Sequence, residues 1–247
     1  ADLAASDFAP YLVVYDPSGG VVGTNWNYDV AAFSFKASVS GTYTALVFDY
    51  SSGWDGTGNY KLYFTKAPGS NEHGALDATN PIDGTIELGD LDSYTFAVTS
   101  GAGIQLRVAD VAQTAFAPYL VVYDPNGAVV TTNWNYDVAA ISFTPSVSGT
   151  FTAVVFDNSS GYDSTGTYKI YFSQAPGSSD GGVLDPNNPT DGTIDLGDLD
   201  AYTFAATPNV GVQLRVADVA QTAFAPYLVV YDPTGAVVGT NWNYDVA

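Results

Sequence analysis

One stretch of sequence occurs three times, and its spacing constrains the fold more than any other feature. It reads FAPYLVVYDPSGGVVGTNWNYDVA from Phe8 to Ala31, and it begins again at Phe116 and at Phe224. The period is therefore 108 residues in both intervals. A unit of this length is too long for a solenoid repeat or a propeller blade, and it is long enough to bury its own core. The sequence predicts a tandem array of similar domains.

The complete unit in the middle of the chain alternates apolar and polar residues as β-strands do. Tyr94, Phe96 and Val98 fall on one face of a predicted strand, while the residues between them fall on the other. The run YLVVY at 119–123 is nearly continuous in apolar residues, as in a strand that is buried on both faces. The predicted strands span residues 84–88, 91–98, 104–108, 119–123, 128–132, 138–143, 151–156 and 168–172.

Turn signals separate these segments, and no helical period is present. Asp124-Pro125-Asn126-Gly127 is one such signal, because Pro presets the backbone of a turn and Gly tolerates its later positions. About eight short strands with turns at this spacing predict an all-β chain of tandem antiparallel, jelly-roll-like β-sandwich domains. We expect a partial first repeat at 1–66, a linker at 67–81, a complete repeat at 82–174, a linker at 175–189 and a partial third repeat at 190–247.

Both ends of the sequence fall inside a repeat, since Ala1 aligns with Ala109 and Ala247 aligns with Ala139. Two interpretations follow. The sequence is a window from a longer repetitive protein, or the open ends complete each other between chains in a head-to-tail polymer. We favour the window, because the duplicated stretch from Phe8 to Ala31 would be redundant in the polymer.

The composition excludes several classes of function. The net charge is −20, and of 26 acidic residues only Glu72 and Glu87 are glutamates, which leaves 24 aspartates. Such a surface repels nucleic acid and anionic lipid, so we expect neither as a partner. No apolar run approaches the roughly 20 residues of a membrane span. Cysteine is absent, which removes disulfides and thiol catalysis, and the single histidine, His73, lies in a linker and aligns with Gly181. We therefore expect no enzyme, because a repeated catalytic base is missing.

Two loops are rich in oxygen ligands of the kind that Ca²⁺ prefers. One contains Asp137 and the other begins at Asp157 and ends at Asp163. Together with Asp90 and Asp92 they offer the oxygens that a calcium site needs. The alternative is that these residues form turns on a solvated face.

A loop of the form Trp-Asn-Tyr occurs in every repeat. Exposed aromatic rings beside amides suit a carbohydrate platform or a protein contact. The alternative is that the Trp closes one end of the sandwich core. Because the loop is nearly identical in each repeat, we favour a contact between domains or within a lattice. The pairs are Trp26 and Tyr28, Trp134 and Tyr136, and Trp242 and Tyr244.

The order of motifs in the middle unit resembles the bacterial pre-peptidase C-terminal domain. GTIELGDLDSYTFAV is followed by IQLRV, APYLVVYDPNGAVV, AAISFTPSVSGTFTAVVFD and TGTYKIYF. The resemblance implies a secreted jelly-roll sandwich that is appended to proteases or repeated in surface proteins, with the collagen-binding domains of clostridial collagenases among its relatives. It also implies calcium where the linker meets the Tyr-x-Phe strand, although the Glu-rich run of those linkers is absent here. The implied ligands are Asp77, Asp90 and Asp92 in the middle unit, and Asp185, Asp198 and Asp200 in the third.

We therefore expect an extracellular or cell-surface structural or adhesive protein. Its partners would be copies of itself in a rod or filament, with calcium stiffening the joints. The alternative is a module that binds collagen or carbohydrate and is appended to a larger secreted enzyme. Repetition favours the first, because a rod must keep the same contact surface in every unit.

Overall fold

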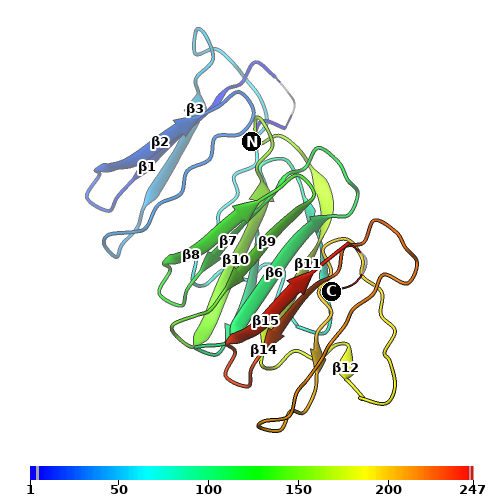
Figure 1. Ribbon diagram of the computed structural model, residues 1–247. Coiled ribbons are helices and arrows are strands. Elements are labelled where there is room, and N and C mark those ends of the chain that lie inside the picture. The colour runs from blue at the N-terminus through cyan, green and yellow to red at the C-terminus, as the bar shows by residue number, and fades with distance from the viewer. Residues whose placement is uncertain (4–5, 245, 247) are drawn as a thin grey trace.

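The middle unit is a complete sandwich of two four-stranded antiparallel sheets (Figure 1). The computed structural model describes residues 1–3, 6–244 and 246. One sheet has the strand order β5-β10-β7-β8 and the other β4-β11-β6-β9. The strands are β4 (Ile82–Ile86), β5 (Asp92–Val98), β6 (Gly103–Asp110), β7 (Pro118–Tyr123), β8 (Val129–Trp134), β9 (Val138–Phe143), β10 (Gly149–Asp157) and β11 (Gly166–Ala175).

The core of this unit lies between the two sheets. Apolar residues at alternate positions of β5 and β6 point inward, so Phe96 and Leu106 are almost fully buried. Phe151 from β10 and Ile170 from β11 meet them in the same cluster. Leu120 and Val122 on β7 face the core, so Val121 between them points to the outer face of the sheet. Val121 is buried as well. The expectation of a strand covered on both faces is therefore confirmed for β7.

The first unit is one three-stranded sheet of order β2-β1-β3. The segment that matches β11 forms no regular strand there, and a single bridge between Asp2 and Tyr60 takes the place of the ladder between β6 and β11. Its side chains are exposed as a result. Leu62 and Phe64 are 56 % and 84 % exposed, whereas the matching Ile170 is 1 % exposed. The strands are β1 (Pro10–Tyr15), β2 (Val21–Trp26) and β3 (Thr44–Asp49).

The described residues of the third unit form two short two-stranded sheets. Its hairpin of β14 (Tyr227–Tyr231) and β15 (Val237–Trp242) repeats the register of β7 with β8, including the shift in register near the turn. A short parallel pair, β12 (Gly182–Val183) and β13 (Tyr202–Thr203), joins the linker to the Tyr-x-Phe segment. The prediction of an all-β fold with more than one sandwich unit is confirmed. No helix long and apolar enough to cross a membrane occurs among the described residues.

Aspartates fix many of the turns by accepting backbone hydrogen bonds. Asp157 is 3 % exposed, and its carboxylate accepts the amides of Ala117, Ser159 and Ser164 at 3.0–3.1 Å. The matching Asp49 of the first unit accepts three amides in the same way. The short side chain of Asp keeps its carboxylate close to the backbone and so suits this role, which explains the excess of Asp over Glu.

Candidate functional site

The contacts between neighbouring units recur with the period of the sequence. At the joint between the first and middle units, a Cβ added at Gly89 would lie 2.8 Å from the Cβ of Ala1. At the joint between the middle and third units, a Cβ at Gly197 would lie 2.7 Å from the Cβ of Ala109. Each of these four residues matches its counterpart 108 positions away. The two joints, called here the first joint and the second joint, therefore share one geometry.

The tips of two equivalent hairpins, β7–β8 in the middle unit and β14–β15 in the third, make a second recurring contact. A Cβ at Gly127 would lie 2.6 Å from the carbonyl oxygen of Ala67, and one at Gly235 would lie 2.9 Å from that of Ala175. Both glycines have a positive φ, 74° and 92°, as the turn requires. The joint thus brings backbone against backbone, and only glycine leaves room for this approach.

At the second joint the ring of Tyr231 lies over the start of β6. A Cβ at Gly103 would lie only 2.2 Å from that ring, so the ring occupies the space above the glycine. The side-chain amide of Gln105 donates to the Tyr231 hydroxyl at 2.9 Å. Next to it, the Arg107 guanidinium donates to the carbonyl oxygen of Asp198 at 3.2 Å. The third unit is therefore seated on the β6 side of the middle unit by steric fit and by hydrogen bonds.

A tyrosine of one unit lies close to acidic residues of the next unit at each joint. At the first joint Glu87 accepts hydrogen bonds from Lys61 and Tyr63. At the second joint the matching tyrosine is Tyr171, which is 5 % exposed. Burial, with the negative charges of Asp198 and Asp195, raises the pKa of Tyr171 to about 12.

A network of polar side chains ties the first linker to the middle sandwich. His73 Nε2 lies 2.9 Å from Oδ1 of Asp92, which is 1 % exposed. The hydroxyl of Tyr168 donates to Oδ2 of the same carboxylate at 2.5 Å, and it lies 2.7 Å from the hydroxyl of Tyr94. Burial raises the pKa of Asp92, while the bonds from Tyr168 and His73 act in the opposite direction. The sequence places His73 in a linker, and the structure pairs it with Asp92.

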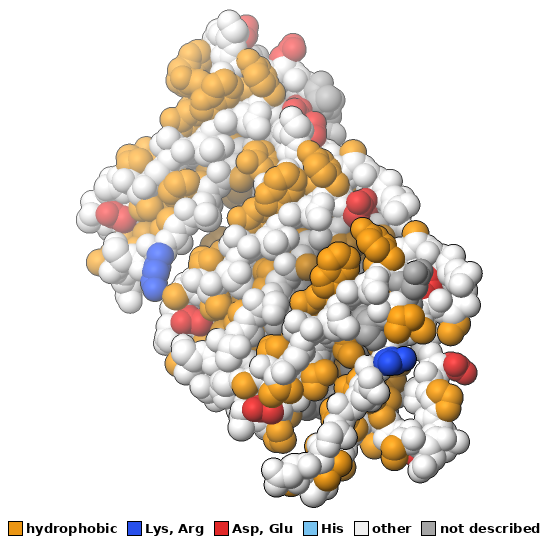
Figure 2. Space-filling model, in the orientation of Figure 1, with side chains coloured by type: hydrophobic (Ala, Val, Ile, Leu, Met, Phe, Trp, Pro, Cys, Tyr) orange, Lys and Arg blue, Asp and Glu red, His pale blue; other side chains and the backbone are white. Residues whose placement is uncertain are grey.

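The aspartates predicted to bind calcium serve several different roles. Asp77 and Asp185 accept the amides two residues ahead at 2.9 Å, and Asp90 and Asp198 accept the next amide at 2.8 Å. Burial and the charges of Asp198 and Asp180 raise the pKa of Asp200. Asp137 and Asp163 are exposed, whereas Asp157 is turned inward. Figure 2 shows carboxylates scattered singly over this face of the molecule. The structure does not gather the predicted set into one site.

Carboxylates from two units nevertheless meet at the second joint. Asp77, Asp180 and Asp198 line one hollow of about 20 Å³ together with Asn80. A space of this size holds about one water molecule or a small ion. Among the described residues, however, the one group of three titratable ligands within 4.8 Å of each other is Glu72, His73 and Asp92.

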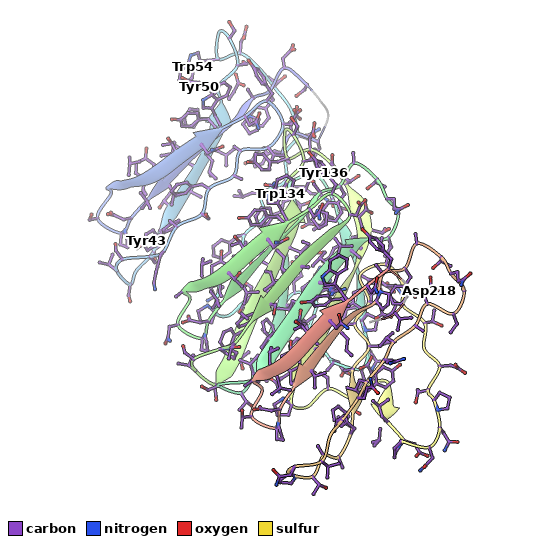
Figure 3. All side chains as sticks on the ribbon, in the orientation of Figure 1. Tyr43, Tyr50, Trp54, Trp134, Tyr136 and Asp218 are labelled. Carbon is purple, nitrogen blue, oxygen red and sulfur yellow. The ribbon has the colours of Figure 1, made fainter. Side chains whose placement is uncertain are left out.

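The aromatic rings of the Trp-Asn-Tyr loops are exposed in every repeat. Trp26, Trp134 and Trp242 are 46 %, 46 % and 60 % exposed, so none of them closes the core. Each packs edge-on against the Tyr two positions later, at 5.6–5.9 Å between ring centroids. Figure 3 shows Trp134 and Tyr136 side by side at the end of β8.

The first unit extends its loop into a larger aromatic cluster. Tyr50 lies 5.2 Å from Trp26 and 5.3 Å from Trp54 between ring centroids. Figure 3 shows Tyr50 and Trp54 together at one end of that unit. The middle unit has Asn158 and Tyr162 at the two matching positions, so the cluster is smaller there.

Known structures resemble single units of the chain. The pre-peptidase C-terminal domain of a collagenase from Bacillus anthracis is 20 % identical and covers 42 % of this chain and 97 % of its own, with a TM-score of 0.36. A copper-binding surface protein, CorA, of Methylomicrobium album is 13 % identical over 40 % of this chain and 96 % of its own, with a TM-score of 0.33. No family model matches the sequence, and no curated protein matches it. The resemblance covers about two fifths of the chain and concerns the small β-sandwich.

The raised pKa of Tyr171 predicts that the second joint weakens at alkaline pH. Its folded pKa of about 12 lies above the ordinary value of 10.0, so the folded state keeps the proton longer than the unfolded state. Its contribution to stability is therefore complete below pH 10 and is lost as the pH rises through 12. Urea unfolding with a chelator present should show the wild type losing stability relative to Tyr171→Phe across this range. A constant difference between the two proteins would contradict the assignment.

Proposed function

We propose that the chain is part of an extracellular structural or adhesive protein, in which tandem β-sandwich units form a stiff rod or filament. The observation that carries this proposal is the recurrence of the joint. Gly89 and Gly197 occupy the same place in successive joints, and so do Gly127 and Gly235. A joint that repeats with one geometry gives a regular superstructure, in which each unit is related to the next by the same rotation and translation.

The linkers support a stiff joint as well. They do not separate the units, because hairpin residues of one unit contact the residues that lead into the linker after the preceding unit. The linker before the middle unit is also bonded to β5, with Leu76 donating to the carbonyl of Thr95 at 2.8 Å. The matching Leu184 donates to Thr203 at the same distance. Linkers that are held in this way behave as spacers of fixed length.

Substitution at the hairpin tip tests the joint, and the chain contains its own control. Gly19, Gly127 and Gly235 are equivalent turn residues with positive φ, but a Cβ at Gly19 meets nothing within 4 Å. A Cβ at Gly235 would lie 2.5 Å from the carbonyl oxygen of Gly101. Gly235→Ala should therefore increase the radius of gyration and the flexibility measured by small-angle X-ray scattering. Gly19→Ala carries the same backbone strain, about 1 kcal/mol, and should leave the scattering unchanged.

A second pair of variants covers the case in which the altered turn relaxes locally. Tyr231→Ala removes the ring above Gly103 and the hydrogen bond from Gln105. Tyr15→Ala changes the equivalent residue of the first unit. Scattering profiles for Gly235→Ala and Tyr231→Ala that match the wild type would reject the stiff joint.

Calcium at the second joint is part of the proposal. Support comes from the hollow lined by Asp77, Asp180 and Asp198, where oxygens of two units converge. A bound ion would offset the repulsion among these carboxylates and would raise the resistance of the joint to unfolding. Calorimetric titration of the chain with Ca²⁺ tests this, with Asp198→Asn as the comparison. Equal binding by both proteins, or no binding at millimolar Ca²⁺, would contradict the proposal that calcium binds at the joint.

The exposed aromatic loops favour lateral contacts between rods or with a matrix polymer. Trp134→Ala should reduce filament assembly, measured by electron microscopy, and should change the free energy of unfolding by less than about 1 kcal/mol because the ring is 46 % exposed. Val129→Ala, on the same strand and 56 % exposed, is the control. A large loss of folding stability in Trp134→Ala would show instead that this ring contributes to the core. Unassembled chains that bind collagen or a polysaccharide through Trp134 would favour the ligand-binding module instead.

A further inference from the structure

The first linker and the start of β5 bring a histidine against a buried carboxylate. His73 Nε2 and Asp92 Oδ1 are 2.9 Å apart, and Glu72 places a carboxylate oxygen within 4.8 Å of a ligand atom of each residue. Asp92 is buried, His73 is about one-third exposed at its side chain, and Glu72 is exposed. The three ligand atoms therefore run from the protein interior to the solvent.

The backbone holds these side chains in place. The Glu72 amide donates to Ser93 Oγ and the His73 amide to the Ser93 carbonyl, both at 3.1 Å. The imidazole also packs against the ring of Tyr94, at 5.4 Å between centroids. The linker thus runs along β5 and presents two consecutive side chains to Asp92 without a further change in the fold.

A second layer of hydrogen bonds orients the buried carboxylate. Tyr168 donates to Asp92 Oδ2 at 2.5 Å, so Oδ1 is the oxygen that faces His73. Tyr94 supports Tyr168 at 2.7 Å between hydroxyl oxygens. Partners of this kind fix the orientation of metal ligands, and their loss weakens metal affinity by about 10- to 100-fold.

The types of ligand suit a transition metal better than calcium. Zn²⁺ binds nitrogen and carboxylate oxygen at about 2.0–2.2 Å. Tetrahedral ligands at this bond length lie about 3.4 Å apart, so His73 and Asp92 would separate by about half an ångström when the ion replaces the hydrogen bond between them. Calcium prefers six to eight oxygens, and an imidazole is not among its usual ligands. Two carboxylates and a neutral imidazole also balance a divalent charge.

Open coordination positions would face a solvent-accessible hollow. His73 and Tyr168 line this hollow with Asp83, Thr85 and Thr167, and its volume is about 460 Å³. Asp83 adds a further negative charge on the same side. Water molecules could complete the shell of an ion bound at the edge of this space.

We propose that Glu72, His73 and Asp92 form a binding site for one divalent transition-metal ion of the Zn²⁺ class, which fastens the first linker to the middle sandwich. The site is independent of the calcium hollow at the second joint. The matching residues before the third unit are Asp180, Gly181 and Asp200, which include no imidazole. In the described part of the chain the site therefore occurs once, in the linker before the middle unit.

Calorimetric titration of the whole chain with Zn²⁺ tests the site. We expect one Zn²⁺ ion to bind tightly to each chain. This binding should persist in excess Ca²⁺. His73→Gly, which introduces the residue found at position 181, should weaken this binding by at least about 10-fold. Glu72→Gln, at an exposed position, should weaken it without affecting the fold. Asp191→Asn, at an exposed position that lines neither hollow, should leave zinc binding unchanged.

Copper serves as a spectroscopic probe of the same ligands. The electron paramagnetic resonance spectrum of the chain with one equivalent of Cu²⁺ should show coupling to one imidazole nitrogen, and His73→Gly should abolish it. Circular dichroism melting checks that the middle unit remains folded in each variant. Absence of tight zinc binding, equal binding by His73→Gly, or displacement by millimolar Ca²⁺ would each overturn the proposal.

Discussion

The whole structure depends on the packing of two four-stranded sheets against each other. Neither sheet can bury its apolar face alone, and the middle unit shows what closure achieves. Ile170 is 1 % exposed when β4 and β6 flank its strand, whereas the matching Leu62 is 56 % exposed. A side chain at this repeat position is therefore buried where strands flank its own strand on both sides.

Strand positions were predictable because the inward and outward faces of each strand differ in polarity. The strand from Val138 to Phe143 has the predicted bounds, and β5 begins one residue after its predicted start. β4 was placed two residues too late, at 84–88, because its alternation is short and Gly84 interrupts it. The face of Gly84 is filled by the ring of Tyr168, a contact between residues far apart in sequence that local alternation does not reveal.

The candidate site was only partly predictable. Aspartate counts pointed to calcium, but most carboxylates are engaged by amides a few residues away, as Asp157 is by Ser159. Turn formation and metal binding use the same side chain, so composition alone cannot separate them. His73 was set aside because it is not repeated. Its contact with Asp92 depends on how the linker lies along β5, which no residue pattern in the linker encodes.

The joints explain why the period shows no drift. Their contacts combine positions from across the unit, since Gly197 meets Ala109 while Gly235 meets Ala175. An insertion between any two of these positions would shift one contact relative to the other, and the joint is so close that even a Cβ added at Gly197 would lie 2.7 Å from that of Ala109. A joint made of small residues and bare backbone is therefore specific through shape. That specificity requires a fixed repeat length, and the sequence displays it as a constant interval of 108 residues.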